Sequence, residues 1–169
     1  MIYEEYDAYE MYKDVSFFNL AAKGTEPVYS PIAQETFDRL ERQLALVLEE
    51  VSEAAVAIRD KDKSEILKEV LDVGVVWMGM LQILENAGYD VWSAAQVVCD
   101  NNNSKIMNNI VDAVESVEQH FDAGVEAYVD TTKVGGTEYF SVRRKKDGKI
   151  LKPYFFKKAD VSDYVPMVH

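Results

Sequence analysis

The feature that most constrains the fold is a pair of long helical patterns separated by a short polar break. In the first, apolar residues recur at three- and four-residue steps between residues 40 and 58. In the second, an amphipathic start leads into the apolar run VGVVWMGMLQIL, which begins at Val73. Because only a short break joins them, we expect helices over residues 31–60 and 62–86 to pack antiparallel.

Local signals set the ends of these two helices. Ser30 and Pro31 suit the cap and the first position of a helix, so they are predicted to begin the first one. Asp62 or Ser64 is predicted to begin the second, and Gly88 to end it.

The segment VGVVWMGMLQIL presents apolar side chains on nearly every face of the second helix, which is typical of a helix enclosed by other helices or by another subunit. Gly74 and Gly79 would let a neighbouring helix approach closely. For a chain this short, dimerisation is the simplest way to enclose the run, so we expect a dimer.

The rest of the chain indicates shorter elements. Four tyrosines at three-residue spacing are expected to pack an N-terminal arm on the bundle: Tyr3, Tyr6, Tyr9 and Tyr12. Helices are predicted over residues 14–22, 90–99 and 105–122, with the Asx-rich break CDNNNSK before the last. Strands are predicted over 125–129, 138–143 and 149–155, with a hairpin turn at Asp147–Gly148.

These elements predict a mainly α fold. We expect an antiparallel helical bundle with a small C-terminal β-hairpin lobe. The whole chain, residues 1–169, is predicted to form a single domain, with the helical core over about 11–124 and the lobe over about 125–165.

Charge and cysteine content exclude several classes of function. The chain has 30 acidic and 18 basic side chains, a net charge of −12, which argues against binding nucleic acid or an anionic membrane. No apolar run reaches the length of a membrane helix, and no targeting segment is visible. A single cysteine, Cys99, indicates a reducing compartment, so we expect a cytoplasmic protein.

Five carboxylates on the two long helices form the most informative pattern. Glu49, Glu50 and Glu53 lie on the first helix, and Glu69 and Asp72 on the second. Spacings of three and four residues place side chains on one helical face. The break midpoint lies near residue 61, so antiparallel packing would bring the two groups level.

Five carboxylates at one height would repel one another, and unpaired buried charge is costly. Lys68 offers little relief, because on an ideal helix it points about 100° away from Glu69. Oxygen ligands without a nearby His or Cys suit Mg²⁺, with Mn²⁺ as the alternative. The other interpretation is that these residues form a plain solvated helix face.

The pattern resembles that of the all-α nucleoside triphosphate pyrophosphohydrolases, the MazG-like group. The family motif EExxE, followed after a spacer by ExxD, is present as Glu49-Glu50-x-x-Glu53 and Glu69-x-x-Asp72. The chain is most similar to a bacterial and phage subgroup related to phosphoribosyl-ATP pyrophosphohydrolase, through the segments YSPIAQETFDRLERQLALVLEE, NNNSKIM and DGKILKPYFF. Where the subgroup often has a histidine before the Asn segment, this chain has Cys99.

The resemblance implies Mg²⁺-dependent cleavage of the α–β phosphoanhydride of a nucleoside triphosphate. It implies Glu49, Glu53, Glu69 and Asp72 as metal ligands and Glu50 as the general base, although Glu49 could exchange roles with Glu50.

The resemblance also implies an N-x-x-K pair near the nucleotide, in which Asn102 reads the base or sugar and Lys105 holds a phosphate. Two lysines of the predicted hairpin, Lys149 and Lys152, could close over the phosphates; strand alternation turns them to opposite faces, and we expect Lys152 to be the one. It suggests a homodimer and leaves a tetramer of paired dimers open, in the cytoplasm of a bacterium or of the host of a phage. Two other functions stay open. One is hydrolysis of phosphoribosyl-ATP; the other is a non-catalytic acidic protein that imitates DNA and binds a basic partner.

Overall fold

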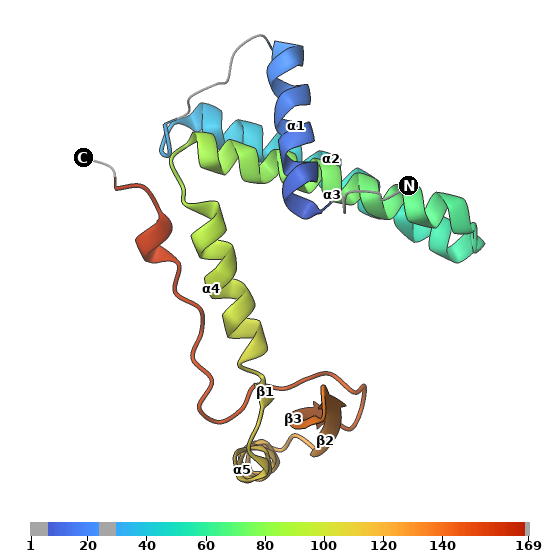
Figure 1. Ribbon diagram of the computed structural model, residues 1–169, viewed down its shortest axis with the longest axis vertical. Coiled ribbons are helices and arrows are strands. Elements are labelled where there is room, and N and C mark those ends of the chain that lie inside the picture. The colour runs from blue at the N-terminus through green and yellow to red at the C-terminus, as the bar shows by residue number, and fades with distance from the viewer. Residues whose placement is uncertain (1–6, 24–29, 168–169) are drawn as a thin grey trace. The chain divides into compact units, whose positions relative to one another are not determined.

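The computed structural model describes residues 7–23 and 30–167. The chain is mainly helical, at 62% helix, with a small three-stranded antiparallel sheet, which confirms the expected class. It divides into two compact units, one formed by residues up to Val91 and from Asp163 onward, the other by Trp92–Ser162 (Figure 1). The helices of residues 92–122 therefore group with the sheet, whereas we expected them in the helical core.

The first unit is built on two long helices. Helix α2 (Gln34–Asp60) and helix α3 (Lys63–Asn86) lie antiparallel and side by side, as expected (Figure 1). Helix α1 (Ala8–Lys23) packs on α3 and begins earlier than the predicted residue 14. Tyr3 and Tyr6 lie outside the described residues.

A tight turn explains why α2 and α3 meet. Lys61 adopts a left-handed conformation with φ of 59°, and the Asp62 amide donates back to the Ala57 carbonyl. The Asp62 carboxylate then accepts from the amides of Ser64 and Glu65 at 3.1 and 3.2 Å, which caps α3 as predicted.

The start of α2 differs from the prediction. Ser30 and Pro31 lie in a turn, and the helix begins at Gln34. The Ser30 carbonyl, rather than its side chain, accepts from the Ala33 amide and from the buried Thr36 hydroxyl, at 3.2 and 2.6 Å. The turn satisfies these groups without a side-chain cap.

The α3 glycines allow close packing within the unit. A Cβ on Gly74 would lie 3.2 Å from Met11 of α1, and one on Gly79 would lie 2.8 Å from Gln43 of α2. The core around them contains Tyr12, Val15 and Met78.

Gly88 ends α3 as predicted, with φ of 88° and the Tyr89 amide donating to the Leu84 carbonyl. The following residue Asp90 receives the returning chain, because its amide donates to the Tyr164 carbonyl at 3.0 Å. Tyr164 belongs to a 3-10 turn, η1 (Ser162–Tyr164).

In the second unit, two predicted boundaries are wrong. Helix α4 (Val91–Asn103) continues through the Asx-rich segment, where Asn101 donates to the Lys157 carbonyl. Helix α5 (Ile110–Asp122) begins five residues later than predicted, because residues 106–107 form strand β1 (Ile106–Met107). Asn109 caps α5 by accepting from the Val111 amide at 2.9 Å.

The sheet has the order β1-β3-β2. Strands β2 (Ala127–Val134) and β3 (Thr137–Arg144) form a hairpin closed by Gly135 and Gly136, both with positive φ. Met107, Ala113 and Val142 form the core between the sheet and α5.

The predicted strand over 149–155 is wrong, and the Asp147–Gly148 turn is not the main hairpin. Only an isolated bridge joins Ile150 to Arg143. Pro153 has no amide proton to extend the pairing, and the Phe156 amide donates to its carbonyl at 3.0 Å. Among the described residues, no helix is both long and apolar enough to cross a membrane.

Candidate metal centre

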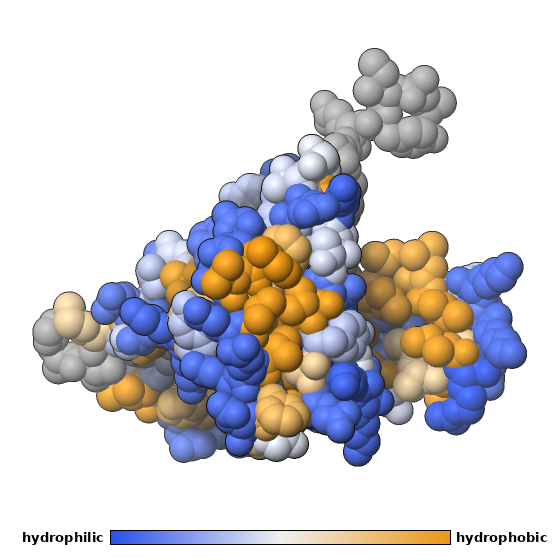
Figure 2. Space-filling view, turned by 90° about the horizontal axis from the view of Figure 1, so that it is seen from below, coloured by the Kyte–Doolittle hydropathy of each residue, from blue (hydrophilic) through white to orange (hydrophobic). Residues whose placement is uncertain are grey.

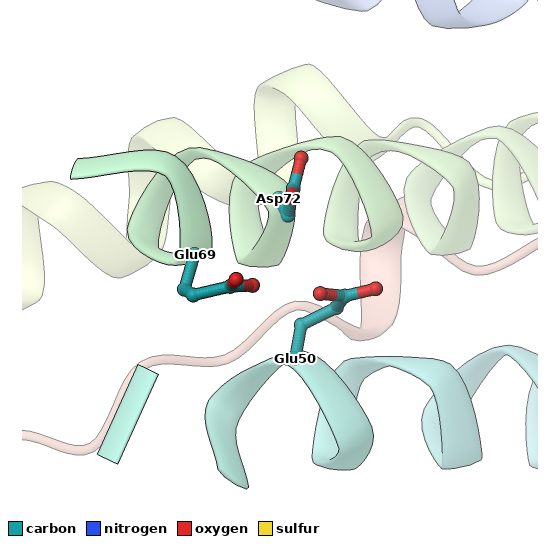
Figure 3. A group of neighbouring side chains, drawn as sticks. All are labelled: Glu50, Glu69 and Asp72. Atoms are coloured by element: carbon teal, nitrogen blue, oxygen red, sulfur yellow. The ribbon is translucent and has the colours of Figure 1, made fainter. Parts of the chain in front are cut away.

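Three carboxylates from α2 and α3 meet in the first unit. Glu50 of α2 and Glu69 and Asp72 of α3 each offer an oxygen, and these oxygens all lie within 4.8 Å of one another. Figure 3 shows Glu50 and Glu69 pointing toward each other between the two helices, with Asp72 further along α3. We call this group the acid cluster.

Glu69 is the most unusual member of the acid cluster. The residue is only 5% exposed, although glutamate is almost never buried without a partner. Its Oε2 atom is buried and, among the residues that the structure describes, has no hydrogen-bond partner. A buried carboxylate oxygen left in this way is a costly arrangement that a bound cation would relieve.

Lys68 reaches the acid cluster, contrary to the sequence-based expectation. Its ammonium lies 2.8 Å from Glu69 Oε1 and 2.9 Å from Asp72 Oδ2. A long flexible side chain can bend back along the helix, and Asp72 is the i+4 neighbour. Hydrogen bonds to Glu69 and then to Asp72 raise the pKa of Lys68, so it stays charged.

Glu50 is electrostatically perturbed. Partial desolvation, followed by the negative charges of Glu53, Asp72 and Glu69, raises the pKa of Glu50 above its ordinary value, while Lys68 opposes the shift. Glu50 therefore holds its proton more readily than a glutamate in open water.

Glu49 and Glu53, the other two acids of the motif, lie outside the acid cluster. Both are exposed on α2. Glu53 and Glu69 both line a neighbouring cavity of about 320 Å³. Glu69 therefore belongs both to the acid cluster and to the wall of this cavity.

The acid cluster fits a hard divalent cation. It offers carboxylate oxygens from two rigid helices and includes no His or Cys. The Glu69 Oε2 atom supplies a metal-donor oxygen that no group in the described part of the chain uses. Glu50, Glu69 and Asp72 are therefore the residues that could hold Mg²⁺ or Mn²⁺.

The predicted substrate-binding residues gather in the second unit. Lys105 donates to Asn102 Oδ1 at 2.7 Å. The Lys105 and Lys152 ammonium groups lie 5.8 and 4.8 Å from the centre of the Phe156 ring. The His120 ring nitrogen Nε2 lies 2.9 Å from the Lys152 carbonyl oxygen.

Sequence reasoning missed Phe156, and with it the ring that both lysines share. The signal available was the aromatic run YFF that follows Pro153. Such a run is common in any hydrophobic core, so the sequence did not distinguish Phe156, whose ring contacts two ammonium groups, from an ordinary core residue.

Compared with known proteins, the chain matches no family model, no curated protein and no solved structure.

Proposed function

We propose that this protein is a Mg²⁺-dependent nucleoside triphosphate pyrophosphohydrolase. The observation that carries the proposal is the acid cluster, in which Glu50, Glu69 and Asp72 converge around a buried carboxylate oxygen without a partner. The EExxE and ExxD spacing supports it, through the resemblance to the all-α pyrophosphohydrolases.

In the proposed reaction, water attacks the α-phosphorus of the nucleotide. The bond from that phosphorus to the oxygen bridging it to the β-phosphorus breaks, giving a nucleoside monophosphate and pyrophosphate. Bound divalent ions would neutralise the triphosphate and lower the pKa of a bound water.

Residue roles follow from the resemblance, and the geometry of the acid cluster supports those of Glu69 and Asp72. Glu50 accepts the proton of the attacking water, and Glu49 is the alternative base. The raised pKa of Glu50 makes it a better proton acceptor than a glutamate in open water. Glu69 and Asp72 are metal ligands, and the resemblance alone adds Glu49 and Glu53, which lie outside the acid cluster.

Asn102, Lys105 and Lys152 are the proposed substrate-binding residues. The two ammonium groups share the Phe156 ring, and among the described residues neither pairs with a carboxylate. Cations of this kind are free to bind phosphate oxygens. Lys105→Met and Lys152→Met are each expected to raise the KM for the nucleotide about tenfold, a loss typical of one charged hydrogen bond.

We further propose that the active form is a homodimer, with a tetramer as the alternative, working in the cytoplasm. On α2, a stripe of apolar residues at helical spacing is exposed: Leu44, Leu48, Val51 and Ile58. Leu71 and Val75 of α3 are exposed as well, and Figure 2 shows apolar patches beside hydrophilic ones on the face it presents. Monomers rarely leave large apolar patches uncovered, so a second copy is the proposed cover.

The test is pyrophosphate release from a panel of ribo- and deoxyribonucleoside triphosphates with Mg²⁺. The variants are Glu69→Gln and, as the matched control, Glu41→Gln at an exposed position of α2. Monophosphate and pyrophosphate from one or a few nucleotides, lost in Glu69→Gln and kept in Glu41→Gln, would support the proposal.

Absence of turnover by the folded protein with any nucleotide, in Mg²⁺ or Mn²⁺, would refute it. Phosphoribosyl-ATP would then be the next substrate. If that also failed, a non-catalytic acidic binding protein would be the better interpretation.

A further inference from the structure

We infer that Lys68 is a tethered counter-ion of the acid cluster, and that a divalent cation must displace its ammonium group in order to bind. The inference deepens the proposed function and rests on its metal site. It concerns what controls the affinity of that site.

The first argument is the place that the ammonium occupies. Lys68 Nζ contacts one oxygen of Glu69 and one oxygen of Asp72, at 2.8 and 2.9 Å. These are two of the three carboxylates that could hold the metal. A cation that used both carboxylates fully would need the oxygens that Lys68 contacts.

The second argument is charge. The acid cluster has three carboxylates, and the one ammonium leaves two negative charges uncompensated. Lys68 also leaves Glu69 Oε2 without a partner. The lysine therefore satisfies the cluster only in part, and a doubly charged ion in its place would neutralise more of the cluster's charge than one ammonium does.

The third argument is that Lys68 can leave at little cost. Its side chain is 57% exposed, whereas that of Glu69 is 7% exposed. A displaced ammonium returns to water, where it is well hydrated, while the buried carboxylate keeps a cation. Lys68 thus holds the metal-free cluster together and weakens metal binding by competing for it.

The experiment compares Lys68→Met with Lys13→Met. Lys13 also pairs with a glutamate, Glu10, through an exposed bridge on α1, so both variants remove one positive charge, with one ion pair lost at Lys13 and two at Lys68. Mg²⁺ and Mn²⁺ binding is measured by titration calorimetry of the full-length chain, and thermal unfolding is followed in EDTA.

We expect Lys68→Met to bind Mg²⁺ about fivefold more tightly than the wild type, the change that one partly exposed ion pair can produce. In EDTA its unfolding temperature should fall more than that of Lys13→Met, and the rise on adding Mg²⁺ should be larger. Lys68→Arg keeps the charge and should bind Mg²⁺ no more tightly than the wild type.

Unchanged or weaker Mg²⁺ binding by a folded Lys68→Met would overturn the inference and leave the proposed function standing, because the lysine would then be a neutral or supporting neighbour. If neither the wild type nor Lys68→Met binds Mg²⁺ or Mn²⁺, the metal role in the proposed function fails, and the inference fails with it.

Discussion

Replacing Glu69 with glutamine should make the metal-free protein more stable and abolish its response to metal. The side chain is buried, carries one oxygen without a partner and faces two other carboxylates. A glutamine of the same shape removes the charge. It also places an amide donor where the neighbouring carboxylates accept.

The size of the effect follows from the unpartnered oxygen. Leaving a buried polar atom unsatisfied costs about 1–3 kcal/mol, and a new hydrogen bond contributes about 1 kcal/mol. Against this, Glu69→Gln weakens the contact with Lys68, which keeps Asp72 as its charged partner. We expect a net gain of about 1–2 kcal/mol, or roughly 4 °C in unfolding temperature for a chain of this length.

The assay is thermal unfolding in EDTA and in Mg²⁺, followed by circular dichroism, with Glu41→Gln as the control. The wild type should be stabilised by Mg²⁺, and Glu69→Gln should not respond. A metal-free Glu69→Gln protein that unfolds at a lower temperature than the wild type would show that the buried charge is satisfied without metal, and the reasoning about the acid cluster would be wrong.

Three further predictions concern other parts of the chain. Leu44→Lys should convert the proposed dimer into monomers, seen by sedimentation; a monomeric wild type would contradict it. Asn109→Ala should destabilise the protein by about 1 kcal/mol through loss of the α5 cap, measured by urea unfolding; no change would show that the cap is dispensable. Hydrogen bonds from Arg144 and then from the Lys149 amide lower the pKa of Asp147 from 3.8 to about 2. Its contribution is therefore complete above pH 4 and is lost as the pH falls toward 2, so Asp147→Asn should flatten the stability profile between these values; an unchanged profile would count against the ion pair.

The paired helices were predictable because their information is local. Apolar steps from Leu44 to Ile58 and the Asp62 cap act within a few turns of helix, so α2, α3 and the break between them followed from the sequence. The strand Ile106–Met107 was not predictable in this way, since two residues have no period and become a strand only by pairing with β3.

The hairpin was mislocated for a different reason. Gly135–Gly136, flanked by Val134 and Thr137, is itself a strong turn signal, and it closes the β2–β3 hairpin in place of Asp147–Gly148. The Asp147–Gly148 turn does not join two long strands. In this turn the Asp147 carboxylate pairs with Arg144.

The acid cluster was predictable in outline only. Spacing of three residues explains why Glu69 and Asp72 share a face, and antiparallel packing explains why Glu50 reaches them. Spacing along an ideal helix did not predict that Lys68 would contact Glu69 and Asp72, because a lysine rotamer responds to the surrounding charge. Nor did the motif show that Glu69, rather than Glu53, would be buried.

The return of the chain to the first unit has a topological consequence. Asp90 and Tyr164 are joined by a backbone hydrogen bond, so the chain leaves the first unit and comes back at adjoining points. The segment between Asp90 and Tyr164 is one long connection that begins and ends at the first unit. The entropy cost of closing such a connection grows only slowly with its length. The polypeptide is therefore organised as an insertion, with all five motif carboxylates in the host segment and Asn102, Lys105 and Lys152 in the insert. A change in the length of the insert would cost the host little free energy.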